Sequence, residues 1–156
     1  MDRTTKTQAC TNFRLRGLTR LVSRFYDSHL VATGLKTTQY SLLTHVMHGG
    51  PLRPTDLADR LNMDASTLTR NLKPMAAAGW LAQTEGVDAR SRLVSITQAG
   101  QKKFAEAQRG WRSAQQELNS MLGTERVLQL HLLINESIEL LRNADGACKD
   151  KKDSDE

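Results

Sequence analysis

The sequence is poor in aromatic residues, proline and cysteine, and it contains no long hydrophobic run. Only 4% of the 156 residues are aromatic, with three prolines and two cysteines. The longest strictly apolar run, residues 75–78, is far shorter than the roughly 18–20 residues that cross a bilayer. The first ten residues also lack the apolar core of a signal peptide. We therefore expect a protein with no membrane partner and no secretion signal.

The two cysteines, Cys10 and Cys148, form neither a CxxC pair nor a disulfide ladder, which is typical of a reducing compartment. A cytoplasmic location is the expectation. The sequence also lacks the phosphate-binding glycine motifs, the zinc-protease motif and the nucleophile elbow of common enzyme classes. His45 and His48 could begin a zinc site, but no companion ligand cluster accompanies them. The sequence thus predicts no enzyme activity, no metal and no cofactor.

The charge is unevenly distributed within a net charge of +5. Residues 1–30 carry six Lys and Arg against two Asp, whereas residues 104–156 carry seven against ten acidic residues. A basic first part joined to an acidic last part indicates one surface that meets a polyanion and another that does not.

Helical periodicity covers most of the chain. In residues 11–31, apolar side chains recur at the spacing of one helix face, and a second helix is expected to begin at Thr37 or Thr38 and to end before Gly49. Thr97 is expected to cap a long helix. Apolar residues recur along this helix at spacings of three and four residues, and such a seam indicates a partner helix. The seam consists of Phe104, Ala107, Trp111, Ala114, Leu118 and Met121. A last apolar helix is expected from a cap at Thr124 to about Arg142, followed by a disordered tail.

Between these helices lies a predicted helix-turn-helix followed by a hairpin. Pro54 is suited to the first turn of a short helix, the Asn62-Met63 pair breaks it, and Asp64 can cap a second helix that ends near Ala78. Residues 80–84 and 93–96 have the composition of strands around a polar turn. The order predicts a winged helix-turn-helix.

The second helix of this unit presents polar side chains suited to DNA. Leu68 and Leu72 are predicted to face inward, and hydroxyl, amide and cationic groups can bond base edges or phosphates in the major groove. In the hairpin, Arg90 and Arg92 can enter the minor groove, with Asp88 holding an arginine in place. A solvated polar face is the alternative, but the order of elements favours DNA. The predicted contacts are Ser66, Thr67, Thr69, Arg70, Asn71, Lys73, Asp88, Arg90 and Arg92.

These residues carry a resemblance to a known family. The stretch LADRLNMDASTLTRNLKPM, then GW and DARSRLVSITQAG, resembles the winged helix-turn-helix of the multiple-antibiotic-resistance regulator (MarR) family. The D-x-R and T-x-x-G patterns, here Asp88 with Arg90 and Thr97 with Gly100, are the most specific part. With the flanking helices, the resemblance covers roughly residues 10–142.

The resemblance implies a homodimeric repressor that binds double-stranded, pseudo-palindromic DNA, with the outer face of the recognition helix, residues 65–78, and the wing as contacts. The expected fold is mainly α with a small β-hairpin wing, an α+β winged helix-turn-helix with N- and C-terminal dimerisation helices. The expected parts are an N-terminal dimerisation helix (1–36), a DNA-binding domain (37–100), C-terminal dimerisation helices (101–142) and a disordered tail (143–156). Apart from the resemblance, the two apolar terminal helices favour dimerisation.

One residue conflicts with a regular recognition helix. Pro74 removes the amide that would bond the carbonyl of Arg70, at a cost of about 3 kcal/mol in a helix interior. We expect a bend or break near residues 70–74. It could tilt Arg70 and Asn71 in the groove, or it could only let Met75 and Trp80 pack.

The family resemblance also implies a small, often aromatic and anionic, effector that releases DNA, and physical criteria suggest where it binds. Arg16, Arg20 and Arg24 form one row that could meet a carboxylate, and His45 and Trp111 could supply a polar and an aromatic wall. Surface arginines and core packing are the alternative. A thiol-redox repressor that senses oxidant through Cys10 is a second hypothesis. A helical protein-interaction module without DNA binding is a third.

Overall fold

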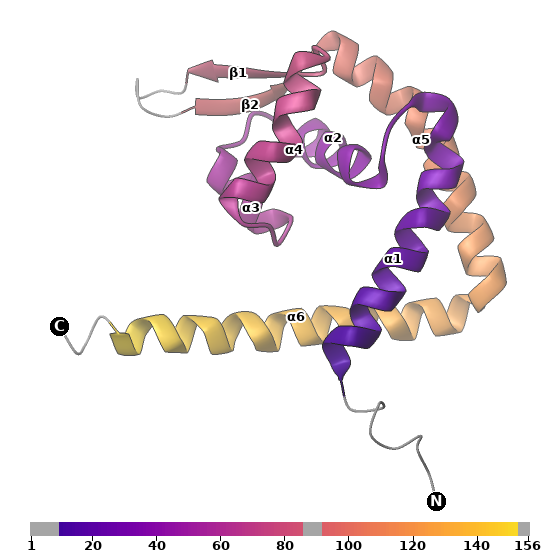
Figure 1. The fold of residues 1–156 in the computed structure, drawn as a ribbon, viewed down its shortest axis with the longest axis vertical. Coiled ribbons are helices and arrows are strands. Elements are labelled where there is room, and N and C mark those ends of the chain that lie inside the picture. Colours follow the sequence, from indigo (N-terminus) through magenta and orange to yellow (C-terminus); the bar gives the residue numbers. More distant parts are fainter. Residues whose placement is uncertain (1–9, 86–91, 153–156) are drawn as a thin grey trace, which may run out of the picture. The chain divides into compact units, whose positions relative to one another are not determined.

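The computed structural model describes residues 10–85 and 92–152, with the backbone only for residues 85 and 145–152. The described chain is mainly helical with one two-stranded antiparallel hairpin, which confirms the predicted fold class (Figure 1). The chain divides into two compact units, residues 1–114 and 115–156. The elements are α1 (Thr11–Leu30), η2 (Val31–Thr33), α2 (Thr37–Gly49), α3 (Pro54–Arg60), α4 (Ala65–Ala77), β1 (Leu81–Glu85), β2 (Arg92–Ile96), α5 (Gln98–Leu122) and α6 (Thr124–Lys152).

The helix-turn-helix forms as its local sequence predicts. Pro54 occupies the first turn of α3, where its missing amide costs no hydrogen bond. The turn passes through Asn62 at φ +51°, a left-handed conformation that asparagine tolerates better than most residues. Asp64 then caps α4 by accepting the amide of Thr67.

The hairpin follows α4 directly. β1 and β2 pair from Leu81 with Ile96 to Glu85 with Arg92. Leu52 adds a short bridge to β2, because its amide donates to the carbonyl of Val94 and its carbonyl accepts the amide of Val94. Each strand lies within one residue of its predicted range.

One core joins α2, the helix-turn-helix, the hairpin and the start of α5. The central side chains are almost completely buried, among them Leu42, Leu43, Val46, Leu57, Leu68, Met75 and Val94. Leu68 and Leu72 are 1% and 5% exposed, as their spacing predicts. Burial of this face fixes which side of α4 remains in solvent.

The Thr97 and Gly100 pair holds the base of the hairpin against α5. The Thr97 hydroxyl lies 2.6 Å from the carbonyl oxygen of Gly79 and accepts the amide of Gly100 at 3.0 Å, so the predicted cap is confirmed. A Cβ at Gly100 would collide with the carbonyl oxygen of Trp80. The T-x-x-G spacing thus reflects a cap followed by a close approach of two backbones.

The predicted start of α2 is confirmed, whereas the predicted end of α6 is wrong. α2 does begin at Thr37, but its cap is Asp27 of α1, whose carboxylate accepts both the amide and the hydroxyl of Thr37 at 2.7 Å. At the other end of the chain, α6 includes residues 143–152 and runs to Lys152 instead of ending near Arg142. That segment is polar but contains no proline, so its backbone can continue the helix. The start of α6 is as predicted at Thr124, after Gly123 at φ +82°.

The expected break at Pro74 does not occur. α4 continues to Ala77, only three residues beyond the proline, where few helical hydrogen bonds remain to be lost. Met75 is fully buried and Trp80 packs against the core, which agrees with the packing alternative.

The predicted seam of α5 is largely covered within the chain. Phe104, Ala107 and Ala114 are buried, and Trp111 packs against the core, so the first half of the seam needs no second helix. Met121 remains 57% exposed. The division at residue 114 lies inside α5.

Candidate nucleic-acid interface and adjacent pocket

The outer face of α4 carries all six polar residues that the sequence singled out. Ser66, Thr69, Arg70 and Lys73 are exposed, and Thr67 and Asn71 are half-buried. The opposite side of the helix is anchored in the core. The structure thus presents these side chains together on one helix, four of them exposed and two half-buried.

The first turn of this face is organised around Asp64. Its carboxylate accepts the Ser66 hydroxyl, the Thr67 amide at 2.7 Å and the Thr67 hydroxyl at 2.7 Å. Hydrogen bonds from Ser66 and then Thr67 hold the pKa of Asp64 well below its usual range. At neutral pH the group is a carboxylate that accepts hydrogen bonds from both hydroxyls. Thr69 likewise donates, to the carbonyl oxygen of Ala65 at 2.8 Å.

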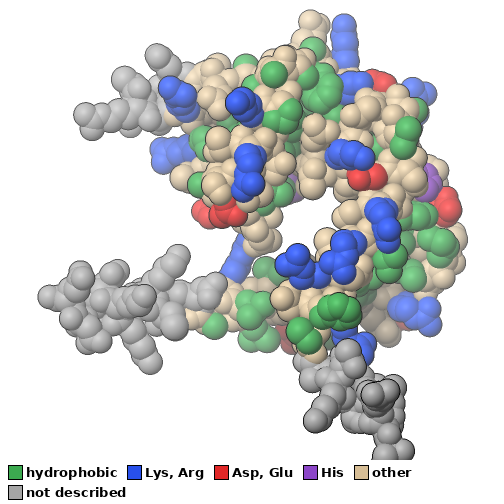
Figure 2. Space-filling view, in the orientation of Figure 1, with side chains coloured by type: hydrophobic (Ala, Val, Ile, Leu, Met, Phe, Trp, Pro, Cys, Tyr) green, Lys and Arg blue, Asp and Glu red, His purple; other side chains and the backbone are tan. Residues whose placement is uncertain are grey.

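The remaining polar side chains of the face make no hydrogen bond or ion pair with other described residues. Within the described residues, no hydrogen bond or ion pair engages the side chains of Arg70, Asn71 or Lys73. Figure 2 shows further Lys and Arg side chains spread over the lobe that carries α3, α4 and the hairpin. Unpaired cations beside an amide on a solvent-facing helix are suited to phosphates and base edges.

The wing is described only in part. Arg92, at the start of β2, is exposed and has no ion pair among the described residues. Asp88 and Arg90 lie outside the described residues, so their predicted roles stay predictions.

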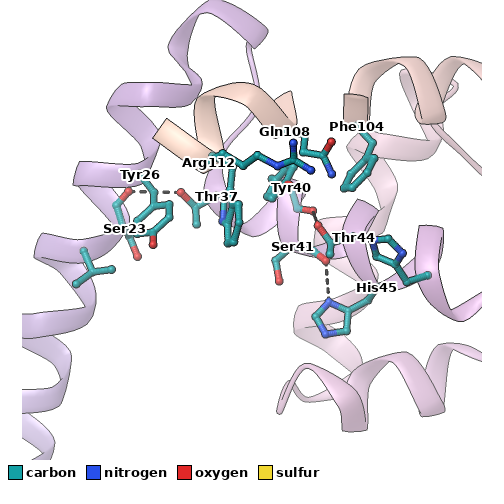
Figure 3. A pocket seen from close by; sticks show the side chains of 13 residues that line it. Ser23, Tyr26, Thr37, Tyr40, Ser41, Thr44, His45, Phe104, Gln108 and Arg112 are labelled. Atoms are coloured by element: carbon teal, nitrogen blue, oxygen red, sulfur yellow. Dashed lines mark hydrogen bonds between the residues drawn. The ribbon is translucent and has the colours of Figure 1, made fainter. Parts of the chain in front are cut away.

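A pocket of about 620 Å³ lies in the same unit, bordered by α1, α2 and α5 (Figure 3). Its apolar lining is a row of aromatic rings. Tyr40 stacks on Phe104 with ring centroids 5.5 Å apart and on Trp111 at 5.8 Å, and Trp111 also lies 6.3 Å from Tyr26. The volume and the lining are typical of sites for small aromatic molecules.

The structure brings together only part of the predicted effector site. His45 and Trp111 both line the pocket, but Arg16, Arg20 and Arg24 are exposed on α1 and do not line it. The cation in the lining is Arg112. The arginine row does not line this pocket, because α1 contributes a later turn, with Val22, Ser23 and Tyr26.

Sequence reasoning missed Arg112, although a signal was present. Phe104, Gln108, Trp111 and Arg112 stand at i, i+4, i+7 and i+8, so the polar residues share a helix face with the aromatic ones. In the close-up, Gln108 and Arg112 both reach toward the space above Tyr40 (Figure 3).

The pocket offers neutral phenols and an oriented imidazole. Burial raises the pKa of Tyr26, and burial also raises that of Tyr40, against the opposing effects of Thr44 and the positive charge of Arg112. His45 Nδ1 lies 2.8 Å from the carbonyl oxygen of Ser41, which can only accept, so Nδ1 carries a proton. In the neutral ring Nε2 is then an acceptor.

Three other features that the sequence raised are a redox cysteine, a metal site and a membrane-spanning helix. Cys10 is exposed at the amino end of α1. In the part of the chain that the structure describes, no three or more His, Cys, Asp or Glu gather as metal ligands. Among residues 10–85 and 92–152, no helix combines the length and apolar character needed to cross a membrane.

Comparisons with known proteins agree with this geometry. The model of the MarR family matches residues 33–91. The uncharacterized HTH-type transcriptional regulator YwoH of Bacillus subtilis is 32% identical over 87 residues, which span 56% of this chain and 64% of that protein. These relatives are named as regulators and not as enzymes, as the sequence predicts.

Solved structures show the same fold. The transcriptional regulator MosR of M. tuberculosis, in complex with DNA, superposes with a TM-score of 0.74 at 29% identity, covering 85% of this chain and 98% of that one. A MarR variant from E. coli, complexed with operator DNA, gives a TM-score of 0.78 at 20% identity, covering 87% and 99%. The second likeness concerns the fold alone.

Proposed function

We propose that this chain, whose residues 33–91 match the model of the MarR family, is a transcription regulator that binds double-stranded DNA through α4 and the hairpin. The observation that carries the proposal is the outer face of α4, where no other described residue engages the side chains of Arg70, Asn71 and Lys73. Leu68 and Leu72 anchor the opposite side of the helix. The DNA complex of MosR supports the same assignment.

The proposal is tested by selection from a randomised duplex library, together with mobility shifts on the DNA upstream of the protein's own gene. We expect one pseudo-palindromic sequence to be enriched. Its binding constant should fall steeply with salt, because each neutralised phosphate releases counterions. Each such contact contributes about −0.9 to the slope of log K against the logarithm of the salt concentration. Binding that ignores sequence, or that does not change between low and high salt, would contradict the proposal.

We also propose that the regulator acts as a homodimer. α6 exposes four large leucines by more than 60% of their surface: Leu132, Leu133, Leu140 and Leu141. α1 exposes Phe13 by 64% and Leu21 by 60%. Apolar surface of this extent is rare on a monomer, and burial against a second copy would remove it from water. Light scattering should give a mass near twice 17.4 kDa, and Leu132→Glu with Leu133→Glu should shift it toward the monomer.

The pocket supports an effector-responsive repressor. A small aromatic acid would stack on the Tyr40 and Trp111 rings and place its carboxylate by Arg112. Benzoate serves as a probe and benzamide as its uncharged control in a thermal-shift assay, since a ligand of the folded state raises Tm. We expect stabilisation by benzoate above that by benzamide and release of the selected duplex.

A thiol-redox repressor is the second candidate, favoured by the exposure of Cys10. Peroxide would then release DNA from the wild type but not from Cys10→Ser, whereas benzoate would have no effect. A protein-interaction module without DNA binding is a weaker alternative, because the face of α4 is cationic and not acidic. The cytoplasmic location expected from the sequence remains a prediction.

A further inference from the structure

We infer that Asp64 determines which bases Ser66 and Thr67 can recognise. Its carboxylate accepts a hydrogen bond from each hydroxyl, so both hydroxyl oxygens can act only as hydrogen-bond acceptors on the recognition face. This rests on the proposed function, since it assigns a specificity role within DNA binding.

The geometry of the first turn of α4 carries the inference. Ser66 Oγ donates to Oδ1 of Asp64, and Thr67 Oγ1 donates to Oδ2 at 2.7 Å. A hydroxyl has one proton and two lone pairs, so each oxygen has only lone pairs left for another molecule. The carboxylate itself also receives the Thr67 amide, so its position is fixed by the helix backbone.

Acceptors of this kind discriminate among the groups that DNA offers. Phosphate oxygens and the O6, N7 and O4 atoms of guanine, adenine and thymine accept and cannot pair with them. The amines of adenine N6 and cytosine N4 donate and can. On the strand that the first turn of α4 contacts, the structure therefore favours adenine or cytosine over guanine or thymine. The negative charge of Asp64 adds to the exclusion of phosphate.

A single substitution can reverse this polarity for Thr67 while keeping the cap. In Asp64→Asn, the amide oxygen can take the place of Oδ1 and still accept the Thr67 amide and the Ser66 hydroxyl. The NH₂ group then stands in place of Oδ2 and donates to Thr67 Oγ1, so the Thr67 proton becomes available to DNA. Asparagine is as good a helix cap as aspartate, so folding is preserved.

The test is base preference, measured with a set of duplexes in which each position of the selected sequence is substituted in turn. At the position where Thr67→Val abolishes the preference, the wild type should favour adenine or cytosine on the contacted strand by roughly threefold to tenfold. Asp64→Asn should shift the preference to guanine or thymine by a similar factor. In a Thr67→Val background, Asp64→Asn should produce no shift.

Three results would overturn the inference. One is an Asp64→Asn protein whose affinity rises equally for all duplexes, because that reports only the lost charge. The second is an unchanged preference, and the third is a shift that persists in the Thr67→Val background. A wild-type protein that enriches no sequence contradicts the proposed function itself, so the two failures are distinguishable. Melting curves of each variant confirm that the helix cap is intact.

Discussion

The recognition face of α4 and the pocket bordered by α1, α2 and α5 both present arginine, but in opposite settings. Arg70 stands on a continuous helix surface in open solvent, with Lys73 close by in sequence. Arg112 stands beside the stacked rings of Tyr40 and Trp111. The first setting suits an extended polyanion that releases counterions, and the second suits one small anion with an apolar body. The surroundings of an arginine, and not the residue type alone, therefore indicate which kind of anion it binds.

The largest effect that would separate the two regions is expected on α4. Replacement of both Arg70 and Lys73 by alanine removes two of the unengaged cations, so affinity for the selected duplex should fall by about a hundredfold or more at 150 mM salt. The salt slope should become shallower by about two. Fluorescence anisotropy measures both quantities.

Arg109→Ala is the matched control for the single variant Arg70→Ala, which removes one positive charge from the face of α4. Arg109 is exposed on α5 and lies outside the face of α4. Loss of the same charge there should change the affinity for DNA less than about threefold. An equal loss in both variants would mean that net charge, and not the face of α4, carries binding.

The pocket is tested by the reverse pattern. Arg112→Met removes the cation and keeps much of the side-chain volume, so binding of benzoate should weaken by about tenfold because a charge-assisted hydrogen bond is lost at a solvent-exposed side chain. Binding of benzamide and of the selected duplex should not change. Isothermal titration calorimetry decides the point, and an unaltered affinity for benzoate would remove Arg112 from the site.

The junction between the regions makes a prediction about stability. β2 leads into α5 through Thr97 and Gly100, and a methyl group at Gly100 would collide with the Trp80 backbone. We expect Gly100→Ala to destabilise the fold by about 1–3 kcal/mol, measured by urea denaturation. Gly17→Ala is the matched control. Gly17 lies within α1 with open space around it, so alanine should stabilise the fold by up to about 1 kcal/mol.

The smallest effect concerns the phenols of the pocket. Tyr26 and Tyr40 are the only tyrosines of the chain, so the tyrosinate absorbance reports on this pocket alone. Burial raises both pKa values above 10.0, which favours the neutral phenol in the folded state. Their contribution to stability is thus complete below pH 10 and is lost as the pH rises through the folded-state values. A titration midpoint at or below that of a tyrosine peptide would contradict the burial.

The two regions also differ in how far their sequences reveal them. The face of α4 comes from one stretch in which helical spacing alone separates Leu68 and Leu72 from Arg70 and Lys73, so exposure could be predicted. The pocket draws on three helices that are distant in sequence, and only their packing decides that the Tyr26 turn of α1 lines it instead of the turns of Arg16 and Arg20. Arg112 was overlooked for the same reason.

Long-range contacts explain the other errors. The cap of α2 is Asp27, ten residues earlier in another helix, and no local pattern at Thr37 reveals it. The polar composition of residues 143–152 predicts disorder, but the segment contains no proline and α6 continues through it to Lys152. Pro74 was expected to break α4, but its position near the helix end reduced the cost.

The central claim is that the outer face of α4 meets DNA, and cleavage from a tethered iron chelate tests it most directly. The chelate is attached to Lys73→Cys in a Cys10→Ser and Cys148→Ser background, with Arg109→Cys as the control position. We predict that the chelate at residue 73 cuts the selected duplex within each half-site and that the chelate at residue 109 does not. Equal cutting from both positions, or no cutting from residue 73 while the labelled protein remains bound, would contradict the account.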